Sequence, residues 1–158
     1  MDEVKAGIVG MGIGKPNARA IDANPRGRVV ALCDLVEEKM EEFAGELEGP
    51  VECYTDYEEM CRNDDIDAVF VGTPNQLHCP VALEAVRNGK HVLVTKPLAD
   101  QLEPAIELVE AAESAGVVNM MSLNNRFADD AQYLGQMTRN GEFGEVYRDV
   151  QTNQFDPM

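Results

Sequence analysis

Basic residues are scarce in this chain. Its 158 residues include 13 Lys and Arg against 29 Asp and Glu, which gives a formal net charge of −16. Proteins that bind nucleic acid through a basic face show the opposite balance, so we expect no nucleic-acid partner. Net charge governs solubility rather than fold, and two explanations of the acidity stay open: adaptation to high salt, or an ordinary acidic protein.

Long apolar runs and paired cysteines are missing as well. No apolar run approaches the roughly 18 residues of a membrane span, and the Met-Asp-Glu start lacks the basic region of a secretory signal. The cysteines show no C-x-x-C spacing, so we expect reduced thiols rather than disulfides or a metal site. These features predict a cytoplasmic protein without membrane contact or bound metal. The cysteines are Cys33, Cys53, Cys61 and Cys79.

Short apolar runs alternate with longer amphipathic segments along the chain. Continuous apolar strands that alternate with helices predict an α/β fold, in which a parallel sheet is covered by helices on both faces. This is a doubly wound sheet of the Rossmann type. Strands are expected near 5–9, 28–33, 51–54, 68–72, 91–94 and 117–121, and helices near 16–23, 36–47, 77–88 and 102–115.

A glycine-rich turn joins the first expected strand to the first helix. Gly10, Gly12 and Gly14 lie in this turn, and Asp34 ends the second strand 22 residues after Gly12. Such a turn lets backbone N–H groups approach a pyrophosphate, and the distant acid can bind the ribose hydroxyls. The third glycine of G-x-G-x-x-G would fall at Lys15, so Gly14 comes one residue early. The alternative is an ordinary strand-to-helix turn.

The pattern predicts a dinucleotide with its pyrophosphate against the backbone of Gly12, Ile13 and Gly14. We expect NAD rather than NADP, because the Asp34 carboxylate would repel a 2′-phosphate. Leu35 and Val36 add no positive charge.

Polar segments follow several strands at the point where each strand ends. In a parallel sheet these carboxyl ends lie at one edge, so the segments would converge on one crevice. For any single segment the alternative is turn chemistry, since Pro and Asn are common turn residues. The segments are Gly10–Gly14, Asp34, Thr73-Pro74-Asn75, Thr95-Lys96-Pro97 and Asn124-Asn125-Arg126.

Several of these motifs together resemble the signature of the Gfo/Idh/MocA oxidoreductases, NAD(P)-dependent enzymes of sugars, cyclitols and related polyols. The resemblance spans nearly the whole chain. One departure is Thr95, where the family usually has Glu, and another is Asn17, where His is frequent. The resemblance rests on the glycine turn, on VGTPNQLH at 71–78 with Ala82 and Ala85, and on GKHVL at 89–93, KPLA at 96–99, NRF at 125–127 and NGEFGEV at 140–146.

The resemblance implies a catalytic role for Lys96. Hydride transfer from an alcohol needs a group that takes the hydroxyl proton, and the positive nicotinamide ring would favour a neutral lysine amine. On sequence alone, Lys96 is a surface lysine that ends a strand. His78 is a second candidate, either contacting nicotinamide or substrate or making a local bond at a helix start. We also expect a cis Lys96–Pro97 bond, and cofactor contacts from Thr73, Pro74, Asn75, Lys96, Pro97 and Arg126.

Family members are about twice as long as this chain. The resemblance therefore implies a Rossmann domain over 1–121, and over 122–158 a connecting helix and first strand of a truncated domain that binds substrate and often forms oligomers. The expected function is the cofactor half of an NAD-dependent polyol oxidoreductase, with an incomplete active site and homo-oligomerisation left open. The alternative is a non-catalytic NAD-binding sensor or regulatory module, since fold does not fix function.

Overall fold

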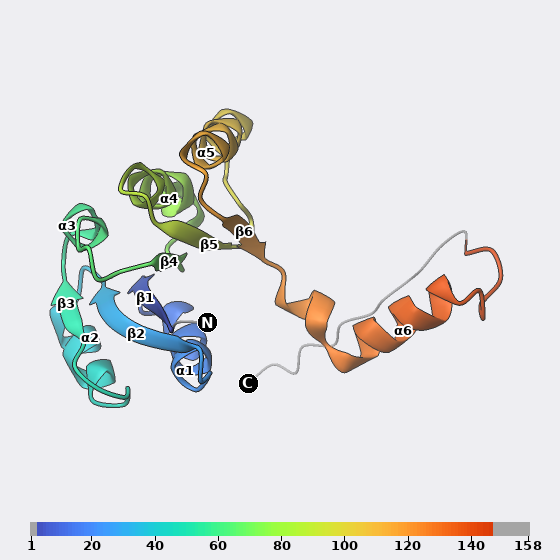
Figure 1. Cartoon of the computed structure of the whole chain (residues 1–158), viewed down its shortest axis with the longest axis horizontal. Helices are drawn as coiled ribbons and strands as arrows, with labels where there is room; N and C mark the ends of the chain where they lie inside the picture. Colours follow the sequence, from blue (N-terminus) through green and yellow to red (C-terminus); the bar gives the residue numbers. More distant parts are fainter. Residues whose placement is uncertain (1–2, 147–158) are drawn as a thin grey trace. The chain divides into compact units, whose positions relative to one another are not determined.

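Six strands between Val4 and Ser122 form one parallel sheet (Figure 1). The computed structural model describes residues 3–146. The strand order is β3-β2-β1-β4-β5-β6, the doubly wound order in which the chain reverses direction between β1 and β4. This confirms the expected α/β fold class. The strands are β1 Val4–Val9, β2 Gly27–Cys33, β3 Glu52–Tyr54, β4 Ala68–Val71, β5 His91–Thr95 and β6 Asn119–Ser122.

Helices connect the strands, and their ends follow recognisable signals. The Asp56 side chain accepts the Glu58 N–H at the start of α3, and Gly116 ends α5 in the left-handed conformation. The first helix begins at Gly14, two residues earlier than expected, so the glycine turn itself forms its N-terminus. The helices are α1 Gly14–Asp22, α2 Glu37–Ala44, α3 Tyr57–Cys61, α4 His78–Arg87, α5 Leu102–Ala115 and α6 Asp129–Arg139, with 3₁₀ turns η1 Asn75–Leu77 and η2 Asn124–Phe127.

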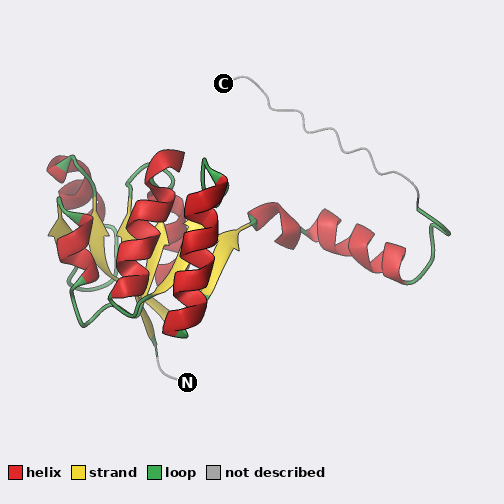
Figure 2. Ribbon diagram, turned by 90° about the horizontal axis from the view of Figure 1, so that it is seen from above, coloured by secondary structure: helices red, strands yellow, loops and turns green. Residues whose placement is uncertain are grey.

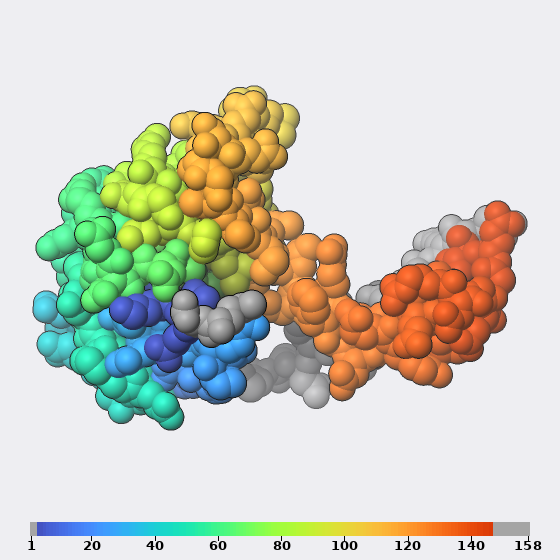
Figure 3. All heavy atoms as spheres, viewed as in Figure 1, coloured from blue at the N-terminus to red at the C-terminus, as the bar shows by residue number. Residues whose placement is uncertain are grey.

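Two hydrophobic clusters lie on opposite faces of the sheet. Helices cover both faces, as Figure 2 shows. Neighbouring residues of a strand point to opposite faces, so Ile8 packs with Phe43 of α2 while Val9 belongs to the cluster with Leu108 of α5. Helices α4 and α5 lie side by side on this second face (Figure 3). Apolar burial on both faces explains why the strands are continuously apolar.

The chain divides into two compact units between Ser122 and Leu123. The first contains the whole sheet with α1 to α5. In the second, the described residues form η2 and α6, and α6 has no buried residue. The first strand expected for the truncated domain, from Val146 to Gln151, lies outside the described residues except for Val146.

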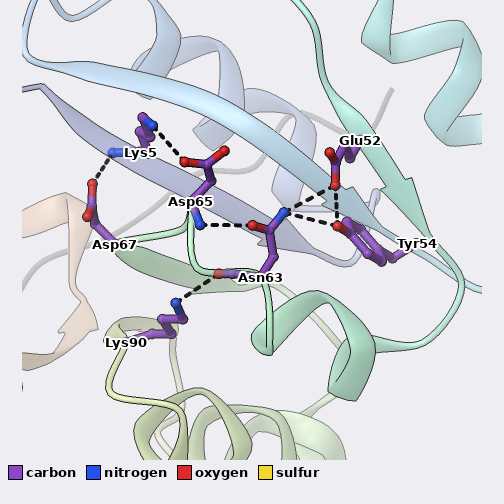
Figure 4. A network of polar contacts seen from close by, with 7 residues as sticks. All are labelled: Lys5, Glu52, Tyr54, Asn63, Asp65, Asp67 and Lys90. Carbon is purple, nitrogen blue, oxygen red and sulfur yellow. Dashed lines mark hydrogen bonds and ion pairs between the residues drawn. The ribbon is translucent and has the colours of Figure 1, made fainter.

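A network of polar contacts around Asn63 joins β1, β3 and the residue before β5 (Figure 4). Before β5, the Lys90 ammonium donates to the Asn63 carbonyl at 2.8 Å, and at β1 the Lys5 backbone N–H donates to Asp67 at 2.8 Å. The Asn63 amide also donates to Tyr54 and Glu52 on β3. The loop before β4 is therefore held from both sides.

The cysteines are free thiols. Burial raises the pKa of Cys33 and of Cys61 to about 12, so both stay protonated at neutral pH. Across residues 3–146 no helix has both the length and the apolar character to cross a membrane, and no cluster of three His, Cys, Asp or Glu could hold a metal ion.

Candidate functional site

The strand register brings the carboxyl ends of the central strands level with one another. Val9 of β1 pairs with Cys33 of β2 and with Val71 of β4, and Val71 pairs with Val94 of β5. The segments that follow these strands therefore start along one edge of the sheet. This edge includes the point between β1 and β4 where the strand order reverses, the usual position of ligands in open α/β sheets.

Three glycines shape the turn after β1, each for a different reason. Gly10 has φ of +92°, and a Cβ there would lie 2.6 Å from the Gly72 carbonyl. A Cβ on Gly14 would lie 2.8 Å from Ile8 Cγ2, so this glycine allows α1 to pack on the sheet. Around Gly12 there is nothing within 4 Å of a Cβ. The turn is thus open at the N-terminus of α1, where backbone N–H groups favour a phosphate.

The Asp34 carboxylate is fixed against this turn. Its Oδ2 accepts the Met11 backbone N–H at 2.7 Å, and its Oδ1 accepts the Val36 N–H at 3.1 Å. A carboxylate has about four acceptor positions, so each oxygen keeps capacity for a ligand hydroxyl. Asp34 therefore joins the end of β2 to the glycine turn while remaining able to bind a diol.

A cavity of about 400 Å³ lies between the glycine turn, the end of β2 and the segment after β4. The Thr73 hydroxyl is buried without a hydrogen-bond partner beside this cavity, and such a group needs a partner. An open glycine cradle, a fixed acid and an unpaired buried hydroxyl fit a dinucleotide. The lining includes Gly10, Asp34, Leu35, Thr73, Pro74 and Leu77.

Several residues that line this cavity were missed by the sequence analysis, and Lys39 of α2 is the charged one among them. Inspection of Leu35 and Val36 indicated no positive charge nearby. Lys39 follows Val36 by three residues, about one helical turn, and this spacing could have revealed it. A 2′-phosphate in this cavity would therefore meet an ammonium group as well as the Asp34 carboxylate.

The turn after β5 carries Lys96, whose side chain is exposed. The Lys96–Pro97 bond is cis, as expected from the sequence. Lys96 and Pro97 line a different cavity, together with Leu98, Asp100 and Met121. The structure thus places them on the same sheet edge as Asp34 but not in the same cavity.

His78 begins α4 and is fully buried. Its Nδ1 lies 2.6 Å from the Pro97 carbonyl oxygen, and its Nε2 lies 2.8 Å from the Thr73 carbonyl oxygen. Both ring nitrogens are therefore engaged by backbone groups. This geometry favours the second of the two roles considered for His78, a structural bond at the helix start, over direct contact with a substrate.

The other residues expected to contact the cofactor lie on three different elements. Ile13 is half exposed at the cap of α1, and Asn75 begins η1 next to Pro74 in an exposed position. Arg126 lies on η2, in the second unit, so the cavity of the first unit does not include it. Its assignment to the cofactor stays a prediction.

Known proteins with similar sequence or structure cover most of this chain. It is 34% identical to a glycosyl hydrolase family 109 protein of Streptomyces filamentosus over 98% of its length, and 46% identical to 1,5-anhydro-D-fructose reductase of Ensifer adhaerens over 58%. The structure of scyllo-inositol dehydrogenase of Lactobacillus casei with NAD(H) and scyllo-inositol matches with a TM-score of 0.85 at 28% identity, covering 91% of this chain and 43% of the enzyme.

The chain spans only part of these proteins, namely 34% of the glycosyl hydrolase family 109 protein and 27% of the reductase. The sequence profile of the oxidoreductase family with an NAD-binding Rossmann fold, Gfo/Idh/MocA, matches residues 4–123. This match contains the glycine turn, Asp34, Thr73 and Lys96. The chain therefore belongs to the Gfo/Idh/MocA family of NAD-binding oxidoreductases.

Proposed function

We propose that this chain is the cofactor-binding part of an NAD-dependent oxidoreductase that transfers hydride between nicotinamide and a sugar, cyclitol or related polyol. The observation that carries this proposal is the cavity beside the glycine turn, where the fixed Asp34 carboxylate and the unpaired Thr73 hydroxyl both lie. The inositol dehydrogenase and the anhydrofructose reductase support the substrate class.

In this proposal each group has a separate task. The N–H groups at the start of α1 hold the pyrophosphate, and Asp34 accepts hydrogen bonds from the adenosine ribose. Bound NAD would supply the hydride acceptor at its nicotinamide ring. The Lys96 amine takes the proton of the substrate hydroxyl in oxidation and returns it in reduction. A second domain, as in the longer relatives, would provide the rest of the substrate site.

Titration calorimetry with NADH and NADPH on this chain tests the cofactor assignment. We expect NADH to bind more tightly, because the Asp34 carboxylate is fixed at the glycine turn, where it accepts ribose hydroxyls and repels a 2′-phosphate. Asp34→Ala should weaken NADH binding and narrow its advantage over NADPH, whereas the matched variant Lys39→Gln should leave NADH binding unchanged. Equal binding of both cofactors by the unaltered chain would contradict the role of Asp34.

A second candidate is glycoside hydrolysis, favoured by the similarity to glycosyl hydrolase family 109 proteins. Some glycosidases depend on NAD, so the same cofactor site suits both activities. The chain joined to a matching second domain, supplied with NAD and either a polyol or an aryl glycoside, separates them. Accumulation of NADH with the polyol supports the dehydrogenase. Release of the phenol without net NADH supports the hydrolase.

A further inference from the structure

His78 connects two segments that the proposed function uses for different purposes. Its Nε2 lies 2.8 Å from the carbonyl of Thr73, in the segment beside the cofactor cavity, and its Nδ1 lies 2.6 Å from the carbonyl of Pro97, in the turn that carries Lys96. These partners are 5 and 19 residues away along the chain. We call this arrangement the His78 link.

We propose that His78 is a positioning residue which holds the cofactor segment at Thr73 and the proton-transfer turn at Lys96–Pro97 in fixed relation, through one ring nitrogen each. The proposal rests on the proposed function of these two segments. It assigns His78 no contact with substrate or cofactor, since both nitrogens are already engaged.

Burial and chemistry support the link. The side chain of His78 is fully buried, so water does not compete for either nitrogen. Carbonyl oxygens only accept hydrogen bonds, so each bond needs an N–H on the corresponding nitrogen. Both ring nitrogens lie within hydrogen-bond distance of a carbonyl oxygen, so the ring stands between the two segments and contacts both.

The neighbouring residue strengthens the connection to the turn after β5. The Cys79 thiol donates to the Leu98 carbonyl at 3.7 Å, a weak bond from the next position of α4. Two successive residues at the start of α4 thus contact two successive carbonyls of the turn. The other bond, to Thr73, belongs to His78. Loss of the ring should therefore disturb the Thr73 segment and the Lys96 turn differently.

Substitution of His78 by Asn or by Gln tests the bonds to Pro97 and Thr73 separately. The amide nitrogen of Asn lies about where Nδ1 lies in His, and that of Gln about where Nε2 lies, so His78→Asn can keep the bond to Pro97 and His78→Gln the bond to Thr73. In ¹³C spectra, we expect the Thr73 carbonyl signal to move in His78→Asn and the Pro97 carbonyl signal to move in His78→Gln.

NADH affinity should depend on the bond from His78 to Thr73 and not on the bond from His78 to Pro97. We expect His78→Asn to weaken NADH binding about fivefold, the effect of losing one hydrogen bond that orders the Thr73 segment. His78→Gln should stay within about twofold of the unaltered chain. If His78 only stabilised the fold, both variants would weaken NADH binding to the same extent. The proposal would be overturned if both variants lost the same NADH affinity. It would also be overturned if the same carbonyl signal moved in both variants.

The unaltered chain provides a test that does not depend on the variants folding. In ¹³C spectra of the unaltered chain, we expect the carbonyl signals of both Thr73 and Pro97 to move when NADH binds, and a response of Thr73 alone would overturn the link. Absence of NADH binding by the unaltered chain would instead count against the proposed function. The carbonyl spectra of the two variants would still decide on the link.

Discussion

Strand β5 has a lysine directly before it and another directly after it, and the two differ in exposure and in contacts. Lys90 is 7% exposed and its ammonium group donates to the Asn63 carbonyl. Lys96 is exposed at the opposite edge. Lys90 belongs to the network of polar contacts around Asn63 (Figure 4), whereas Lys96 lines an open cavity after β5. The contrast indicates that Lys90 serves stability and that Lys96 is accessible to a ligand.

The same substitution at both lysines sharpens this contrast, and the largest effect is expected at Lys96. Lys96→Met, in this chain joined to a matching second domain, should lower kcat by at least about 10²-fold, because the group that transfers the proton is removed. Stability should change by less than about 0.5 kcal/mol, as for other exposed side chains. Steady-state kinetics with thermal unfolding measures both. If the variant turned over as fast as the unaltered protein, Lys96 would have no part in proton transfer and would be an ordinary surface residue.

Lys90→Met should show the reverse pattern. We expect a loss of about 2 kcal/mol in the free energy of unfolding, because the substitution removes a charge-assisted hydrogen bond to the Asn63 carbonyl, which keeps the bond from the Ile66 N–H. NADH affinity should not change. Denaturant unfolding followed by circular dichroism, together with an NADH titration, provides the measurement.

The smallest effect is expected at Lys5, which serves as a control for Lys90. Its ammonium group pairs with Asp65 at 3.0 Å on the surface, and exposed ion pairs contribute between about 0 and 1 kcal/mol. Lys5→Met should therefore lower the free energy of unfolding by less than Lys90→Met in the same denaturant experiment. A loss at Lys5 as large as that at Lys90 would show that burial does not distinguish the two contacts.

Local patterns in the sequence were sufficient for the fold and for much of the site. Apolar runs predicted the strands, and the spacing from the glycine turn predicted the place of Asp34, which accepts the Met11 N–H of the turn and lines the same cavity as Gly10. The role of His78 could not be predicted in this way. Its partners come from two other segments, and only the folded chain brings Thr73 and Pro97 to the two sides of one ring.

Lys39 was missed for a different reason. The charge argument stopped at Val36, although one helical turn further along the chain brings a lysine to the same cavity. Helix ends also differ from expectation by a few residues. α2 ends at Ala44 rather than near Leu47, since local signals locate boundaries less well than the presence of an element.

A pair of glycine substitutions tests most directly whether the carboxyl edge at the glycine turn binds the cofactor. Gly12 and Gly45 both lack positive φ, and a Cβ meets nothing within 4 Å at Gly12 and only the Glu42 carbonyl at 3.8 Å at Gly45. Gly12→Ala and Gly45→Ala should therefore both fold normally.

Only Gly12→Ala places a methyl group where the pyrophosphate approaches the backbone. In calorimetric titrations with NADH, we expect Gly12→Ala to bind at least about tenfold more weakly than the unaltered chain, and Gly45→Ala to bind equally well. Equal NADH affinity of the folded Gly12→Ala variant and the unaltered chain would contradict the placement of the cofactor at this edge.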